Sequence, residues 1–204
     1  MVSIGKLTLK RMIQDASFHS LSDGLAELPM PDVFKIGLKQ YSIPMDLEAF
    51  SGSITYGQRM FFAQEETNDF GIILRMIDGY YYPIVTKKKW DENKSLLFGK
   101  KVLHLKVINL YPIAMHLVSL MGELSEREIK LLRRDPSQQE KAAGIDKLAK
   151  FAELTALKHL MSSMSKSREE VLLTPYNDCL VEFMLAKEQG AFAERLTEIY
   201  KKQK

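Results

Sequence analysis

Apolar residues recur at helical spacing throughout the second half of the chain. The spacing predicts helices over residues 112–122, 126–134, 138–162, 168–173 and 175–201. Three of the predicted starts carry the Ser-x-x-Glu pattern of a capping box, in which the two side chains bind free amides of the first turn. These pairs are Ser125 with Glu128, Ser137 with Glu140, and Ser167 with Glu170. Thr174 before Pro175 predicts another start, because a proline at the first helical position gives up only an unpaired amide.

The first half of the chain shows two kinds of pattern. Helical spacing begins at Thr55, and Asp69 starts a further helix that Gly79 is expected to end. The preceding residues are rich in proline and glycine. Residues 33–38 show the alternation of a short strand, and Leu7, Leu9 and Met12 fit either a short strand or a helix. We therefore predict a mainly α fold, with an irregular or short-stranded N-terminal segment over 1–54 and a helical domain over 55–204.

The predicted helix 138–162 is apolar around most of its circumference. Such a helix is usually buried in its own domain or shared with a neighbouring subunit, and we favour the first interpretation. The predicted helix 175–201 has a more ordinary apolar side, and the lone cysteine, Cys179, belongs to it as a small apolar residue. If the two helices take part in a subunit interface, the residues expected there are Phe151, Leu154, Phe183, Phe192 and Leu196.

Composition narrows the class of protein. The chain has 204 residues, 46% of them hydrophobic, and a net charge of +3, which is ordinary for a globular protein. A single cysteine excludes an internal disulfide and suits a reducing compartment. The most apolar window, 102–121, contains polar residues such as Lys106 and Asn109, and the N-terminus has no signal-peptide pattern. We therefore expect a soluble protein that is made in the cytoplasm and does not bind a membrane.

Sequence patterns of catalysis are missing. The chain contains no glycine-rich phosphate-binding motif, and its histidines at 19, 104, 116 and 159 are not spaced as metal ligands. We therefore expect no catalytic residues, no metal site, no cofactor and no enzymatic activity.

One segment is strongly basic. Between Ile84 and Leu110 there are seven lysines and two acidic residues, a local charge of 7 − 2 = +5, and aromatic residues lie at 80–82, 90 and 98. Lysines interleaved with aromatic residues are typical of single-stranded nucleic-acid binding, for which Lys87, Lys88, Lys89 and Trp90 are the candidates. We favour a solvated loop whose lysine stems cover aromatic surface, because the chain as a whole is not basic.

The order of these features resembles that of small morphogenesis proteins of tailed bacteriophages. The resemblance rests on 55–60, 69–77, 142–151 and 175–178, in a layout that covers about two-thirds of the chain. It implies a non-enzymatic structural protein, an oligomeric ring or connector subunit of a phage particle, with copies of itself and neighbouring assembly proteins as partners. The alternative is a tail-assembly chaperone or another non-structural binding module. No functional residue can be transferred, because these families carry no diagnostic site motif.

Overall fold

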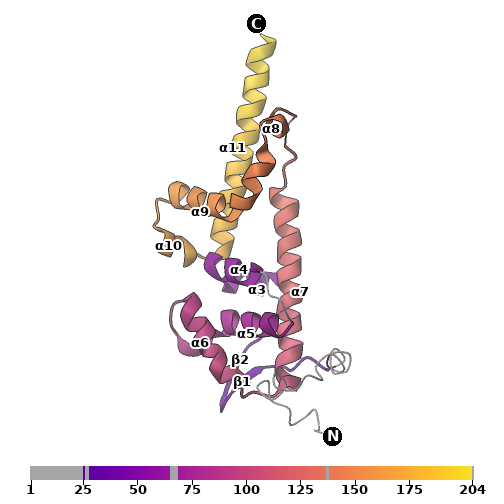
Figure 1. Ribbon diagram of the computed structural model, residues 1–204, viewed down its shortest axis with the longest axis vertical. Helices are drawn as coiled ribbons and strands as arrows, with labels where there is room; N and C mark the ends of the chain where they lie inside the picture. The colour runs from indigo at the N-terminus through magenta and orange to yellow at the C-terminus, as the bar shows by residue number, and fades with distance from the viewer. Residues whose placement is uncertain (1–24, 26–27, 65–68, 137, 204) are drawn as a thin grey trace.

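The computed structural model describes residue 25 and residues 28–64, 69–136 and 138–203 (Figure 1). Two short strands, β1 (Phe34–Ile36) and β2 (Lys39–Tyr41), form an antiparallel hairpin. The helices that follow are α3 (Leu47–Ser53), α4 (Tyr56–Ala63), α5 (Asp69–Thr86), α6 (Glu92–Val102), α7 (Val107–Leu132), α8 (Gln138–Ala142), the 3-10 helix η3 (Ile145–Phe151), α9 (Ala152–Ser163), α10 (Arg168–Leu172) and α11 (Tyr176–Lys202). The prediction of a mainly α fold is confirmed.

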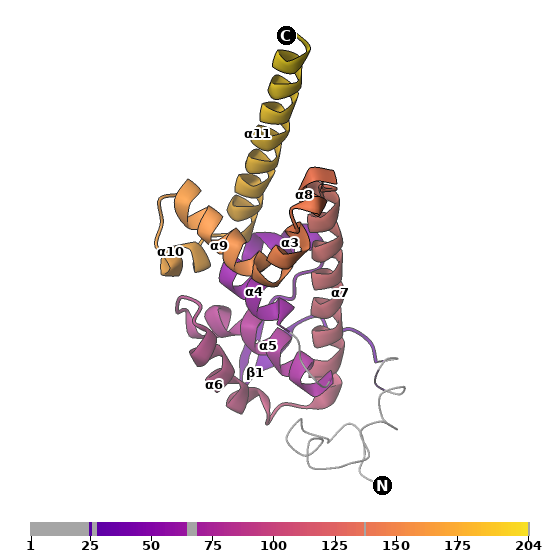
Figure 2. The ribbon, with the colours of Figure 1, turned by 45° about the horizontal axis from the view of Figure 1, so that its top comes forward.

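The main hydrophobic core lies between the hairpin, α3 to α7 and the start of α11, which contributes Tyr176 and Leu180. The buried residues of α7 include Leu110, Ile113 and Leu117, and α5 packs against both α6 and α7 (Figure 2). Among the described helices, α7 is long and apolar enough to cross a membrane by length and composition, yet here its apolar residues build this core. The strand predicted in 33–38 is confirmed as β1, whose Phe34 stacks on Tyr81 of α5 with ring centroids 3.9 Å apart.

Helix α5 does not end at Gly79 as predicted, but continues to Thr86 through Pro83. Gly79 instead lets α4 approach closely, since a Cβ atom there would lie 2.9 Å from Phe61 Cδ1. Proline has no amide hydrogen, so Pro83 deprives the Gly79 carbonyl of its usual helical donor. Gln58 Nε2 replaces that donor at 2.8 Å, while Gln58 Oε1 accepts the Thr55 amide at 3.0 Å and so caps α4. One buried side chain therefore completes the hydrogen bonding of two helices.

The predicted helices 112–122 and 126–134 are wrong as separate elements, because α7 runs through both without a break. Ser125 does not cap a helix. Its Oγ donates to the Met121 carbonyl at 3.0 Å, a hydrogen bond within the helix. The Glu128 carboxylate instead accepts a hydrogen bond from Arg59 of α4. The Ser-x-x-Glu pattern was therefore a chance match at this position.

The segment 138–162 is not the single core helix that the sequence predicted. The segment consists of α8, η3 and α9. Gly144, which has a φ of +82° in the left-handed region that glycine favours, separates α8 from η3. The Ser137 half of its predicted capping box lies outside the described residues, and Glu140 accepts two hydrogen bonds from Arg134 at 2.9 and 3.0 Å. The helices predicted over 168–173 and 175–201 are confirmed as α10, with the capping box of Ser167 and Glu170, and α11.

A carboxyl group is buried where α5 meets α6. Asp78 is 2% exposed, its Oδ1 has no hydrogen-bond partner, and its side chain lies so close to Gly99 of α6 that no Cβ atom fits there. Burial raises the pKa of the Asp78 carboxyl to about 8. This group is therefore mostly neutral in the folded protein at pH 7.

A second, smaller core joins α4 to the C-terminal helices. Its buried members are Tyr56, Leu157, Leu160, Val171 and Cys179. Cys179 is fully buried, and burial raises the pKa of its thiol to about 11. The thiol is thus an apolar packing group, as the sequence indicated.

Candidate protein-binding surface

The base of α11 is joined to the rest of the fold by backbone hydrogen bonds. The Tyr56 amide donates to the Thr174 carbonyl and the Tyr176 amide donates to the Ile54 carbonyl, both at 3.0 Å. This isolated antiparallel bridge ties the start of α4 to the start of α11. It fixes the direction in which α11 leaves the body.

A partly buried polar cluster strengthens the same junction. Arg59 of α4 donates from Nε to Glu128 Oε1 at 2.8 Å and from Nη2 to Glu128 Oε2, and the Tyr176 hydroxyl donates to Glu128 Oε1 at 3.0 Å. Burial, followed by the nearby Glu128 carboxylate, raises the pKa of the Tyr176 hydroxyl. Each group has a partner, so the cluster links α4, α7 and α11 and leaves no free charge for chemistry.

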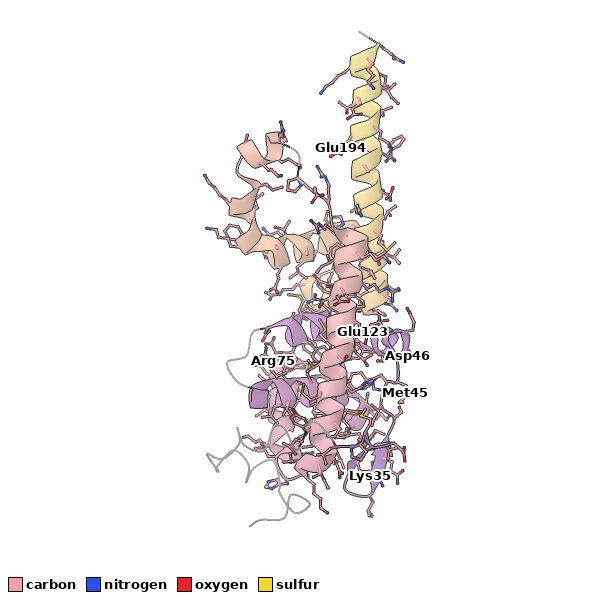
Figure 3. All side chains as sticks on the ribbon, turned by 90° about the vertical axis from the view of Figure 1, so that its right-hand side faces the viewer. Lys35, Met45, Asp46, Arg75, Glu123 and Glu194 are labelled. Carbon is pink, nitrogen blue, oxygen red and sulfur yellow. The ribbon has the colours of Figure 1, made fainter. Side chains whose placement is uncertain are left out.

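Beyond this junction, only one side of α11 contacts the body. Phe183 packs in the second core, with its ring centroid 6.1 Å from that of Tyr56. Further along, Lys187 Nζ donates to the Leu131 carbonyl at 2.8 Å. Glu194, which is labelled in Figure 3, pairs with Arg134 at 2.7 Å. These contacts define the inner side of the helix.

The opposite side of α11 is apolar and exposed. Residues two positions apart in a helix lie about 200° from each other, on nearly opposite sides. Phe183, Lys187 and Glu194 lie on the inner side. The residues two positions before them, Val181, Leu185 and Phe192, therefore face away from the body. We call this surface the outer stripe; its members and their exposed fractions are Val181 (61%), Leu185 (50%), Phe192 (60%), Leu196 (37%) and Ile199 (52%). α11 projects past the body, so the distal part of the outer stripe faces no other described element (Figures 1 and 2).

A second apolar surface lies beside α11, on η3 and α9. Phe151 is 47% exposed and Leu154 49% exposed, and the Lys150 ammonium lies 5.0 Å from the centre of the Phe151 ring. An open groove of about 640 Å³ runs between these helices and α11, with Leu148, Ala156 and Phe183 in its lining. Contiguous exposed apolar surface is typical of protein-interaction sites.

The predicted interface residues thus separate into two groups. Phe151, Leu154, Phe192 and Leu196 are on the surface, whereas Phe183 is partly buried against the second core. Val181, at the base of the outer stripe, was not among the predicted interface residues. Leu185 and Ile199, which complete the stripe, were not among them either. Their signal was the seven-residue spacing of Leu185, Phe192 and Ile199, which returns to nearly the same side of a helix.

The basic segment has a different arrangement from the one that stacking on nucleic-acid bases requires. Lys87, Lys88 and Lys89 are exposed, but Trp90 packs edge-on against Phe61 with ring centroids 5.9 Å apart. The neighbouring aromatic residues at 80–82 and 98 are buried in the main core. These rings are therefore not available for stacking on bases.

The described residues contain no group of three or more His, Cys, Asp or Glu side chains placed to hold a metal ion. His116, one of the candidates considered from the sequence, pairs through Nε2 with the Pro44 carbonyl at 2.7 Å. We found no significant match to this chain among protein-family models, curated protein sequences or solved structures. The case for function therefore depends on the surface of the molecule itself.

Proposed function

We propose that this chain is a non-enzymatic subunit of a protein assembly and binds other subunits through the outer stripe of α11. The observation that carries the proposal is the exposure of five large apolar residues along one side of a helix whose other side is anchored to the body. Burying such residues against a partner is favourable by about 25 cal/mol per Å² of apolar surface. The rigid junction at the base of α11 presents the stripe in a fixed direction.

The resemblance to phage morphogenesis proteins suggests the setting. We propose that the assembly is a phage particle, with this chain as a ring or connector subunit. In that setting the η3–α9 surface, with Phe151 and Leu154, is available for a second contact with a neighbouring subunit.

The proposal is tested by complementation of a phage that lacks the gene. Wild type, Phe192→Asp and the control Lys201→Asp are supplied in turn, and purified particles are examined by mass spectrometry. Lys201 is exposed and lies two positions after Ile199, on the side away from the outer stripe. We expect wild type and the control in the particles at a fixed ratio to the other structural proteins, and Phe192→Asp to be excluded although it is folded.

Incorporation of Phe192→Asp at the wild-type level would overturn the role of the outer stripe. Presence of the wild-type chain in infected cells but not in particles would overturn the structural role and favour an assembly chaperone.

A further inference from the structure

The outer stripe is flanked on one edge by two exposed residues of opposite charge. Glu188 lies four residues before Phe192 and Arg195 lies three residues after it. At about 100° per residue, both fall on the same edge of the stripe, about 40° and 60° from Phe192. Neither charge has an ion-pair partner among the interactions found in the described part of the chain.

This arrangement distinguishes between the two ways in which a second α11 can pack against the first. In a parallel pair in register, the two-fold axis runs along the helices and puts the edge with Glu188 and Arg195 on opposite sides of the contact in the two copies, so that these charges do not pair. In an antiparallel pair that crosses at Phe192, Glu188 of each copy meets Arg195 of the other. Opposite charges at such positions select partner and orientation, so the charge pattern favours the antiparallel pair.

The apolar residues of the stripe fit the same antiparallel register. Leu185 is seven residues before Phe192 and Ile199 is seven residues after it, so Leu185 of one copy meets Ile199 of the other on both sides of the centre. The two Phe192 rings meet at the two-fold axis. A two-fold interface uses the same surface on both subunits, and the stripe is complementary to itself in its apolar pattern and in its charge.

We infer that the partner bound by the outer stripe is a second copy of this chain, held as an antiparallel α11 pair centred on Phe192. This inference rests on the proposed function and specifies its partner. The pair closes as a dimer, which leaves the η3–α9 surfaces of both copies free for further contacts. The inner side of each α11 keeps its bonds to Leu131 and Arg134.

The test is charge exchange on the full chain, with dimer dissociation measured by sedimentation velocity. Wild type is expected to be a dimer. Glu188→Arg and Arg195→Glu alone should each weaken dimerisation about tenfold or more, because each places like charges together. The double variant should return to within about threefold of wild type, because it exchanges the charges and restores opposite pairs. Lys201→Glu, a matched reversal on the inner side, should leave the dimer unchanged, and circular dichroism checks that each variant is folded.

A monomeric wild type at about 100 μM would overturn the inference, because that concentration corresponds to a very weak association. Single reversals without effect, or a double variant that is not rescued, would also overturn it. The outcome is separable from that of the proposed function. If the wild type is monomeric but Phe192→Asp is still excluded from particles, only the inference of self-pairing is overturned. If the dimer depends on the two charges but Phe192→Asp enters particles normally, only the assembly role is overturned.

Discussion

Replacing Asp78 by asparagine should abolish a pH dependence of stability that the wild-type fold carries between pH 5 and 7. The folded-state pKa of this carboxyl is about 8 because of burial, whereas an unfolded aspartate has a pKa of about 3.9. Between these values the folded protein binds one more proton than the unfolded chain. The free energy of unfolding must therefore fall as the pH rises through this window, and level off above the folded-state value.

The expected size follows from the pKa difference. The free energy of unfolding should fall by about 1.4 kcal/mol per pH unit, which amounts to a loss of about 3 kcal/mol of stability from pH 5 to pH 7. An asparagine side chain has nearly the same shape as the aspartic acid but cannot ionise, so this contribution disappears in Asp78→Asn. The asparagine amide also needs a hydrogen-bond partner, and therefore the diagnostic quantity is the pH slope and not the stability at one pH.

The assay is urea unfolding at pH 5, 6, 7 and 8, followed by helical circular dichroism. The free energy of unfolding is plotted against pH for wild type and for Asp78→Asn. Subtracting one curve from the other removes the contribution of the histidines, which are common to both proteins. Asp91→Asn is the matched control. Asp91 is exposed, and its hydrogen bonds with the Lys94 amide and side chain keep the pKa of its carboxyl below the usual value, so it stays ionised in this range. Equal slopes in wild type and Asp78→Asn would refute a neutral, buried Asp78.

Three further predictions concern other parts of the molecule. Gln58→Glu keeps an acceptor for the Thr55 amide but points a carboxylate at the Gly79 carbonyl. It should lower the free energy of unfolding, measured with urea, by about 3 kcal/mol. The control Gln189→Glu, at an exposed position, should lower it little. Phe151→Asp should remain folded with wild-type helical circular dichroism, because nearly half of that side chain is already exposed; a molten variant would contradict its surface position. Replacing Lys87, Lys88 and Lys89 by alanine should change stability by less than about 0.5 kcal/mol. Salt-sensitive binding of single-stranded DNA by the wild type, lost in this triple variant, would contradict the solvated-loop interpretation.

Local signals in the sequence predicted local structure well. The capping box of Ser167 and Glu170 is formed because both residues lie within one helical turn and are exposed, so no distant group competes for them. The identical spacing at Ser125 and Glu128 failed because Arg59, distant in sequence, binds the Glu128 carboxylate. Spacing alone contains no information about such a partner.

The length of α5 and the position of the outer stripe also depend on contacts between residues that are distant in the sequence. Gly79 looked like a helix end, but the side chain of Gln58 supplies the hydrogen bond that Pro83 removes, and only the packing of α4 on α5 brings it there. Phe192 and Leu196 were predicted as interface residues from the apolar side of the helix. Which side of α11 is anchored could not be predicted, since it is decided by Leu131 and Arg134 at the end of α7.

The bridge between Ile54–Tyr56 and Thr174–Tyr176 has a consequence for the order of events during synthesis. Arg59 and Glu128 can meet as soon as α7 has left the ribosome, but Tyr176 and the two bridge hydrogen bonds are added only after α10 has been made. The junction that orients α11 is therefore completed last, when Tyr176 and Leu180 of α11 also take their places in the main core. The outer stripe reaches its final direction only in a chain that has been made as far as α11 and has folded onto it.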